Sequence, residues 1–305
     1  MKKMFFLYNS HAGKGQIRGK LASITDLFTK AGYMVTSYPT QCALDGYDKV
    51  CGADGQYDII VCSGGDGTLN EVISALMTHR NKRPPVGYIP AGSTNDFAAT
   101  LGISRNMQRA AGQIAGGVPF ACDIGKMNGR YFNYVAAFGL FTEVSYKTPQ
   151  NMKNMLGHQA YLFESLKSLS KIKAYSLKVS CNDMEIKGNY IYGMVSNSFS
   201  IGGMKGISGQ GVLLDDGLFE VTLVKEPVTP HELQQVVAGI FSKSQTSPMV
   251  ERFKTSSIIV ESEEALAWTV DGENADSHQR VEISVARTAV EIVVDSSQIE
   301  RISSK

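Results

Sequence analysis

The chain has 305 residues, 43% hydrophobic and 19% charged, which is the composition of a folded protein rather than a disordered one. Its 30 basic and 29 acidic residues leave a net charge of +1, which gives no indication of nucleic-acid binding. The five cysteines form no C-x-x-C pair and the five histidines lie far apart, so neither a disulfide framework nor a zinc site is expected.

No segment contains the roughly 18 consecutive apolar residues that a membrane-spanning helix needs. The apolar run at residues 4–8 is also too short for the core of a signal peptide. The sequence therefore predicts a cytoplasmic protein whose contacts with a membrane are peripheral. A homodimer is compatible with it.

In residues 1–122, strand-like apolar runs alternate with helical patterns. Strands are expected at 4–8, 33–38, 57–62 and 86–89, and helices at about 16–30, near 47 and after 68. Such alternation predicts an α/β domain with a parallel sheet. Ligands of such sheets bind at the carboxyl ends of the strands, where residues 9–15, 64–68 and 91–96 fall.

Residues 123–305 instead show period-two alternation, which predicts a β-rich, sandwich-like domain or distorted barrel. Strands are expected at 131–137, 176–181, 189–196, 218–224, 257–260, 266–270, 281–285 and 290–294. One helix is expected at about 159–171, and another begins at Thr229-Pro230, with threonine as the cap. The domains are thus 1–122 and 123–305, with a C-terminal tail that can return to the first.

A glycine-rich stretch, Gly64-Gly65-Asp66-Gly67-Thr68, follows an apolar run and precedes a helical pattern. Strand, glycine turn and helix start together predict a site where backbone N–H groups converge on phosphate. The spacing fits neither the dinucleotide fingerprint nor the Walker pattern. A carboxylate would repel a bare phosphate, so Asp66 indicates work on a metal or a hydroxyl. A plain glycine-rich hairpin turn is the alternative.

This pentapeptide is the signature of a superfamily that unites diacylglycerol and sphingosine kinases, NAD kinases and 6-phosphofructokinases. Over most of its length the chain resembles bacterial lipid kinases of the diacylglycerol kinase family. The matching motifs are Asn9-x-x-Ala12-Gly13-Lys14, Gly64 to Glu71, Pro90 to Ala98, Cys122 to Lys126, Asp215-Asp216-Gly217 and Asp271-Gly272-Glu273. The resemblance implies an α/β nucleotide domain followed by a β-rich lipid-side domain. NAD kinases lack the Asn95 to Ala98 element.

Two departures from the family pattern concern the third motif. Ser93-Thr94 stands where Thr-Gly is common, and Ala99 stands where an arginine is common. In the family that arginine acts on the substrate side, so its replacement leaves the identity of the lipid open. Ser10 replaces a common proline, which is a milder change.

The resemblance and the loop positions together suggest a set of residues for binding ATP. Backbone groups of the glycine loop, with Thr68 and Asn70, suit the phosphates, and Lys14 can neutralise their charge. The nucleotide-binding set is Asn9, Lys14, Thr40, Gly64, Gly65, Asp66, Gly67, Thr68, Asn70, Ser93, Thr94 and Asn95. For Lys14 the alternative is a solvated loop lysine, and for residues 93–95 it is an ordinary helix cap.

Carboxylates supply the expected chemistry. Asp66 and Asp123 are candidates for the Mg²⁺ and water network that bridges the ATP phosphates, Asp66 being also catalytic. Asp271 and Glu273 are what a kinase needs to accept the proton of a lipid hydroxyl, with Glu273 as base and the exchange of roles left open. Asp271-Gly272 is equally a strong hairpin-turn signal.

A second metal element resembles a structural Mg²⁺ site of the β-rich domain. Asp216 would supply a carboxylate, and Leu213 and Leu218 would supply main-chain carbonyls. A metal-free type I turn is the alternative. The span 144–178 carries six lysines against one acid, which suits either a solvated helix or a basic surface that meets anionic lipids.

These features predict an ATP- and Mg²⁺-dependent kinase that phosphorylates a hydroxyl of a diacylglycerol-like lipid at a membrane surface. A kinase of a sphingoid or soluble substrate is the second interpretation. A nucleotide- or lipid-binding homologue with impaired catalysis is the third, kept open by Ala99.

Overall fold

The fold is taken from a computed structural model, which describes the chain except residues 80, 82, 141–172, 183, 206–207, 209–210, 242–246 and 305. The helix expected at 159–171 and most of the basic span 144–178 therefore lie outside the described residues. Among those described, no helix is both long and apolar enough to cross a bilayer.

The N-terminal part alternates strands with helices, as the periodicity predicts. In chain order it contains β1 (Lys2–Tyr8), the 3₁₀ segment η1 (Ala12–Gly19), α1 (Leu21–Lys30), β2 (Tyr33–Pro39), α2 (Asp45–Cys51), β3 (Ile59–Gly64), α3 (Asp66–Leu76), β4 (Val86–Pro90), α4 (Asp96–Leu101) and α5 (Met107–Gly116). β1 pairs in parallel with β2 and β3, and β3 pairs in parallel with β4. All three loops of interest consequently end up at one edge of these strands.

The helix expected at about 16–30 is wrong in its first turns. Residues 16–19 instead belong to the irregular segment η1, in which the preceding Gly13, Lys14 and Gly15 have φ values of 54°, 65° and 71°, and α1 begins only at Leu21. Residues with left-handed backbone cannot extend a right-handed helix.

The C-terminal part consists mostly of antiparallel strands. It contains β5 (Val118–Met127), β6 (Arg130–Phe132), β7 (Val135–Gly139), β8 (Tyr175–Cys181), β9 (Met184–Ser196), β10 (Ser200–Ile201), β11 (Met204–Lys205), β12 (Phe219–Lys225), α9 (Pro230–Phe241), β13 (Val250–Thr255), β14 (Ser257–Val270), β15 (Glu273–Val294), η3 (Ser296–Gln298) and α10 (Ile299–Ile302). The cap predicted for α9 is confirmed, because Thr229 Oγ1 accepts the Glu232 N–H at 3.2 Å.

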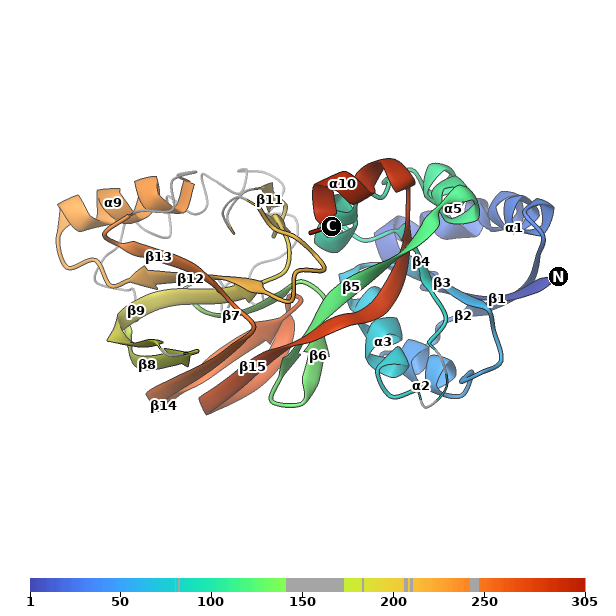
Figure 1. The fold of residues 1–305 in the computed structure, drawn as a ribbon. Helices are drawn as coiled ribbons and strands as arrows, with labels where there is room; N and C mark the ends of the chain where they lie inside the picture. The colour runs from blue at the N-terminus through green and yellow to red at the C-terminus, as the bar shows by residue number, and fades with distance from the viewer. Residues whose placement is uncertain are drawn as a thin grey trace.

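Two long strands connect the parts. β5 pairs along its length with the second half of β15, and the two strands run between the two halves in Figure 1. β15 pairs with β14 at its start and meets β4 through Ile292 and Val86 near its end. The strands expected at 281–285 and 290–294 are thus one strand with an irregularity between Ala286 and Val290. Residues 122 and 123, the expected domain boundary, fall inside β5.

Candidate functional site

An open cleft of about 1080 Å³ lies over the loops that follow β1, β3 and β4. Eight of the residues predicted for nucleotide binding or catalysis line it: Asn9, Lys14, Thr40, Gly65, Gly67, Thr68, Ser93 and Glu273. Gly64, Asp66, Asn70, Thr94, Asn95 and Asp271 are not among its lining residues. The cleft is therefore built in two layers, with a glycine-rich surface over buried polar groups.

The glycine loop opens directly into α3, which begins at Asp66 with Gly65 as its cap. The first N–H groups of a helix have no intrahelical partner, so they favour an anion above the loop. Glu273 reaches over this loop from the β-rich part, and a Cβ at Gly67 would lie 2.7 Å from its Oε1. A larger residue at position 67 would require the exposed side chain of Glu273 to move aside.

Behind the loop lies a cluster of buried carboxyl groups. Burial, reinforced by the charges of Asp96 and Asp271, raises the pKa of Asp66 to about 7. The Asp66 Oδ2 atom accepts the Asp96 N–H at 3.3 Å, whereas Oδ1 is buried and has no hydrogen-bond partner among the described residues. An unpartnered carboxylate oxygen among other acids is a site that a cation would stabilise.

Asp271 is held in a single orientation by surrounding donors. Its Oδ1 accepts the N–H groups of Tyr134 and Val135 at 3.0 and 3.1 Å, and its Oδ2 accepts that of Asn133 at 2.7 Å. Burial nevertheless raises its pKa to about 6. Asp271 and Gly272 have positive φ values of 50° and 85°, so they also form the tight turn that Asp-Gly predicts.

Asn70 is not a lining residue of the cleft. Its Nδ2 donates to Asp271 Oδ2 at 2.8 Å and to the Tyr131 carbonyl at 3.2 Å. It therefore orients a carboxylate from the other end of the chain, and its contact with phosphate stays a prediction.

Asn95 braces its own loop. Its Oδ1 accepts the Gly92 N–H at 2.9 Å and its Nδ2 donates to the Gly92 carbonyl at 2.7 Å. The alternative of an ordinary helix cap is wrong for its side chain, which makes no capping bond to α4. Neighbouring Thr94 accepts a bond from Arg105 through its carbonyl, which leaves Ser93 as the residue of this trio that faces the cleft.

Asp123 has different charged neighbours from Asp66, and the expectation that both belong to one metal network stays a prediction. Its carboxylate accepts the N–H groups of Gly217 and Thr288 at 2.6 Å each, and Asp216 is its carboxylate neighbour. The irregularity in β15 is what aims the Thr288 N–H at Asp123. Local sequence could not show this, because Thr288 lies 165 positions away.

Sequence reasoning missed several residues of the cleft: His11, Gln16, Gln41, Cys42, Ala43 and Glu71. Glu71 has a clear role, because its carboxylate accepts the N–H groups of Leu44 and Gly46 at 3.0 and 3.1 Å. It thereby fixes the rim that follows β2. Its position in the glycine-loop motif was the available signal.

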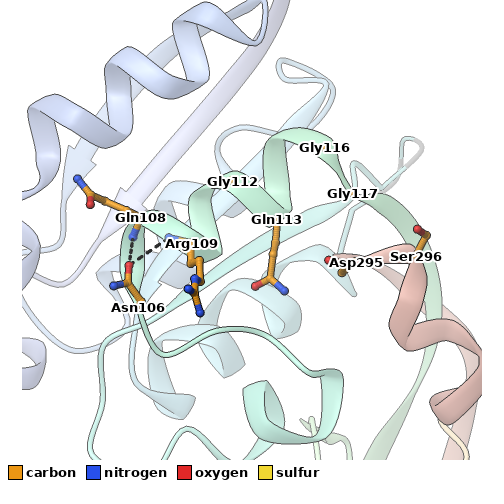
Figure 2. Close-up of a pocket in the computed structure, with 9 residues that line it drawn as sticks. All are labelled: Asn106, Gln108, Arg109, Gly112, Gln113, Gly116, Gly117, Asp295 and Ser296. Carbon is orange, nitrogen blue, oxygen red and sulfur yellow. Dashed lines mark hydrogen bonds between the residues drawn. The ribbon is translucent and has the colours of Figure 1, made fainter.

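A second cleft of about 730 Å³ runs along α5 (Figure 2). Two of its polar side chains bind nearby backbone groups: Asn106 accepts from Gln108 and Arg109, and Asp295 accepts from Ser297. It contains neither the glycine loop nor the carboxyl cluster. The chemistry is therefore assigned to the first cleft.

The backbone at Gly13 gives a prediction for that cleft. Gly13 has a φ of +54°, and a Cβ there would overlap the Ala91 carbonyl oxygen, so Gly13→Ala should push the first loop away from the third. We expect a loss of stability of about 1–3 kcal/mol and weaker nucleotide binding, measured by thermal unfolding and titration calorimetry. Gly19→Ala is the matched control, since no heavy atom lies within 4 Å of a Cβ there. Equal behaviour of the two variants would contradict the packing argument.

Comparison with known proteins agrees with this geometry. Residues 3–127 match the family model of the diacylglycerol kinase catalytic domain, and residues 135–294 match that of the YegS C-terminal NAD kinase beta sandwich-like domain. The fold is also that of a putative diacylglycerol kinase from Bacillus anthracis, with a TM-score of 0.84 at 24% identity over 98% of this chain and 97% of that one.

Curated relatives are similar over nearly the whole chain. A diacylglycerol kinase of Bacillus subtilis is 30% identical over 275 residues, covering 90% of each protein. One of Staphylococcus saprophyticus is 32% identical over 274 residues, covering 89% of each. With its catalytic-domain match and these relatives, the chain belongs to the diacylglycerol kinase family and is a lipid kinase.

Proposed function

We propose that the chain transfers the γ-phosphate of ATP, with Mg²⁺, to the hydroxyl of a diacylglycerol-like lipid. The observation that carries this proposal is the position of Glu273, whose carboxylate stands over Gly67 of the phosphate-binding loop. A base from the lipid-side domain thus faces the place where the terminal phosphate would lie. Phosphoryl transfer depends mainly on such positioning and on electrostatic stabilisation.

Each layer of the cleft has its own task in this proposal. Backbone N–H groups of the glycine loop and the Lys14 side chain hold the phosphates. Glu273 takes the proton of the lipid hydroxyl. The hydroxyl oxygen forms a bond to the γ-phosphorus as the bond between that phosphorus and the β–γ bridging oxygen breaks, which releases ADP. Asp271, whose oxygens already accept four donors, orients the hydroxyl and the loop around it rather than acting as base.

The buried carboxyls suit Mg²⁺. The unpartnered Oδ1 of Asp66 and the raised pKa values of Asp66 and Asp271 fit a cation that arrives with the nucleotide. When bound, Mg²⁺ would neutralise charge on the transferred phosphate. Asp66 would be its protein ligand, directly or through water.

Arg130 supports the position of the base. Its Nη2 lies 3.3 Å from Glu273 Oε2, while its Nη1 donates to the Asn274 carbonyl at 2.7 Å. The guanidinium thus holds the Glu273 side chain against β15, the strand that begins with Glu273. The Glu273 side chain is exposed, so a substrate can reach it.

A lipid substrate implies peripheral contact with a membrane. The candidate substrates are compared by incubating purified protein with γ-labelled ATP and one acceptor at a time. The acceptors are vesicles that contain diacylglycerol, vesicles that contain a sphingoid base, and free glycerol. We expect Mg²⁺-dependent label in diacylglycerol, and cosedimentation with anionic vesicles that weakens as salt rises. Label only in the sphingoid base or glycerol would overturn the lipid assignment, and nucleotide binding without transfer to any acceptor would indicate an impaired enzyme.

A further inference from the structure

The ammonium group of a lysine on a neighbouring strand lies against the turn between residues 211 and 218. The Lys254 ammonium, carried on β13, lies 3.0 Å from Glu220 Oε1 and 3.3 Å from Asp216 Oδ2. It also donates to the Gly211 carbonyl at 2.8 Å. Three oxygen atoms from three separate points of the chain therefore converge on one positive charge.

Burial makes this charge necessary. Glu220 is 4% exposed, and the side chains of Asp216 and Lys254 are 13% and 32% exposed. Two carboxylates so removed from water are destabilising unless a cation compensates them. Within the described part of the chain, Lys254 is the only cation in an ion pair with either of them.

For the same turn, the sequence predicts a structural Mg²⁺ bound through Asp216 and the carbonyls of Leu213 and Leu218. Its atoms do not fit that ion. Asp216 Oδ1 accepts the Leu218 N–H at 2.9 Å, and Oδ2 faces the ammonium. Mg²⁺ demands oxygen ligands at about 2.1 Å in octahedral geometry, and a neighbouring ammonium would repel it.

We propose that Lys254 is the built-in cation of this turn and takes the place of a structural metal ion. It ties β13 to the turn that precedes β12, forms an ion pair with Asp216, and opposes the burial that raises the pKa of Glu220 to about 7. Because Asp123 contacts the same turn through the Gly217 N–H, Lys254 also steadies the backbone that holds Asp123. The turn is thus independent of divalent cations, whereas the nucleotide cleft is not.

Thermal unfolding without nucleotide tests the proposal. The wild-type melting temperature should be the same in chelator and in millimolar Mg²⁺, because a structural ion would stabilise the folded state by mass action. Lys254→Met should melt several degrees lower in chelator and recover part of that loss in Mg²⁺, which can then reach the vacated carboxylates. Adding Asp216→Asn to Lys254→Met should remove the recovery.

Two controls keep the test decisive. Lys225→Met breaks an ion pair of 2.8 Å with Glu251 elsewhere on the sheet, and should show no response to Mg²⁺. Lys254→Arg keeps the charge and covers the case in which Lys254→Met does not fold; it should remain independent of Mg²⁺. A rise in the wild-type melting temperature with Mg²⁺ that Asp216→Asn abolishes would overturn the proposal. So would a Lys254→Met protein that is as stable as wild type in chelator.

Discussion

Replacing Asp66 with asparagine should abolish most phosphoryl transfer. At about pH 8 it should also make the folded protein more stable. We expect kcat to fall roughly 10²- to 10³-fold, the scale of losing one electrostatic contact in a transition state. Both effects have one cause. Burial beside Asp96 and Asp271 makes the charged form of Asp66 unfavourable in the free protein and available to a cation that arrives with ATP.

The direction of the stability effect follows from the two pKa values. An aspartate in an unfolded chain has a pKa of about 3.9, whereas burial raises that of folded Asp66 to about 7. Between these values the folded state binds more protons, so the contribution of Asp66 to stability falls as the pH rises. The full loss of stability from burying charged Asp66 is present above about pH 7 and disappears at about pH 4. Asparagine carries no charge and escapes it.

Unfolding should be followed at several pH values for wild type and Asp66→Asn. Relative to wild type, the free energy of unfolding of the variant should be higher by on the order of 2 kcal/mol at about pH 8 and unchanged at about pH 4. Wild-type kcat/KM should decline as the pH falls below about 7, because protonated Asp66 binds a cation poorly. Asp26→Asn is the control, since Asp26 is exposed and, among the described residues, forms an ion pair only with Lys30 in the same helix. A folded Asp66→Asn protein with near-normal kcat would remove Asp66 from the mechanism.

Local pattern is enough to predict the loops of the cleft. Each follows an apolar strand of the N-terminal sheet, and the carboxyl ends of neighbouring parallel strands meet at one edge. Asn9, Gly65 and Ser93 can therefore be assigned to one surface from the order of strands and loops along the chain. The cap of α9 is another local signal, since Thr229 and Glu232 interact within one turn.

Contacts between distant parts of the chain could not be predicted from the sequence. The glycine-loop motif does not show that Asn70 donates to Asp271, which lies 201 positions away. Nor do the motifs show that β15 brings the Thr288 N–H to Asp123 from 165 positions away. Lys254 has no motif at all, and only the pairing of β12 with β13 places it opposite Glu220. Periodicity predicts elements, but it does not predict which side chains they bring together.

Glu273→Gln should lower kcat roughly 10²- to 10⁴-fold, the usual contribution of a positioned base. Glutamine keeps the shape and can still accept a hydrogen bond from Arg130, but it cannot take the proton of the lipid hydroxyl. Because Glu273 is exposed and its carboxylate meets few partners, the variant should unfold at the wild-type temperature. Nucleotide affinity, measured by titration calorimetry, should change little.

The contrast with Asp271→Asn decides which of the two carboxylates is the base. An asparagine at 271 must turn its NH₂ group toward N–H donors at Asn133 or at Tyr134 and Val135, so it should lose stability as well as activity. Glu282→Gln, an exposed change on the same strand β15, is the matched control and should leave both unchanged. If Glu273→Gln keeps its turnover while Asp271→Asn loses turnover without melting earlier, the roles are exchanged and Asp271 accepts the proton. Loss of turnover in Glu273→Gln alone, with stability intact, identifies the residue over Gly67 as the base.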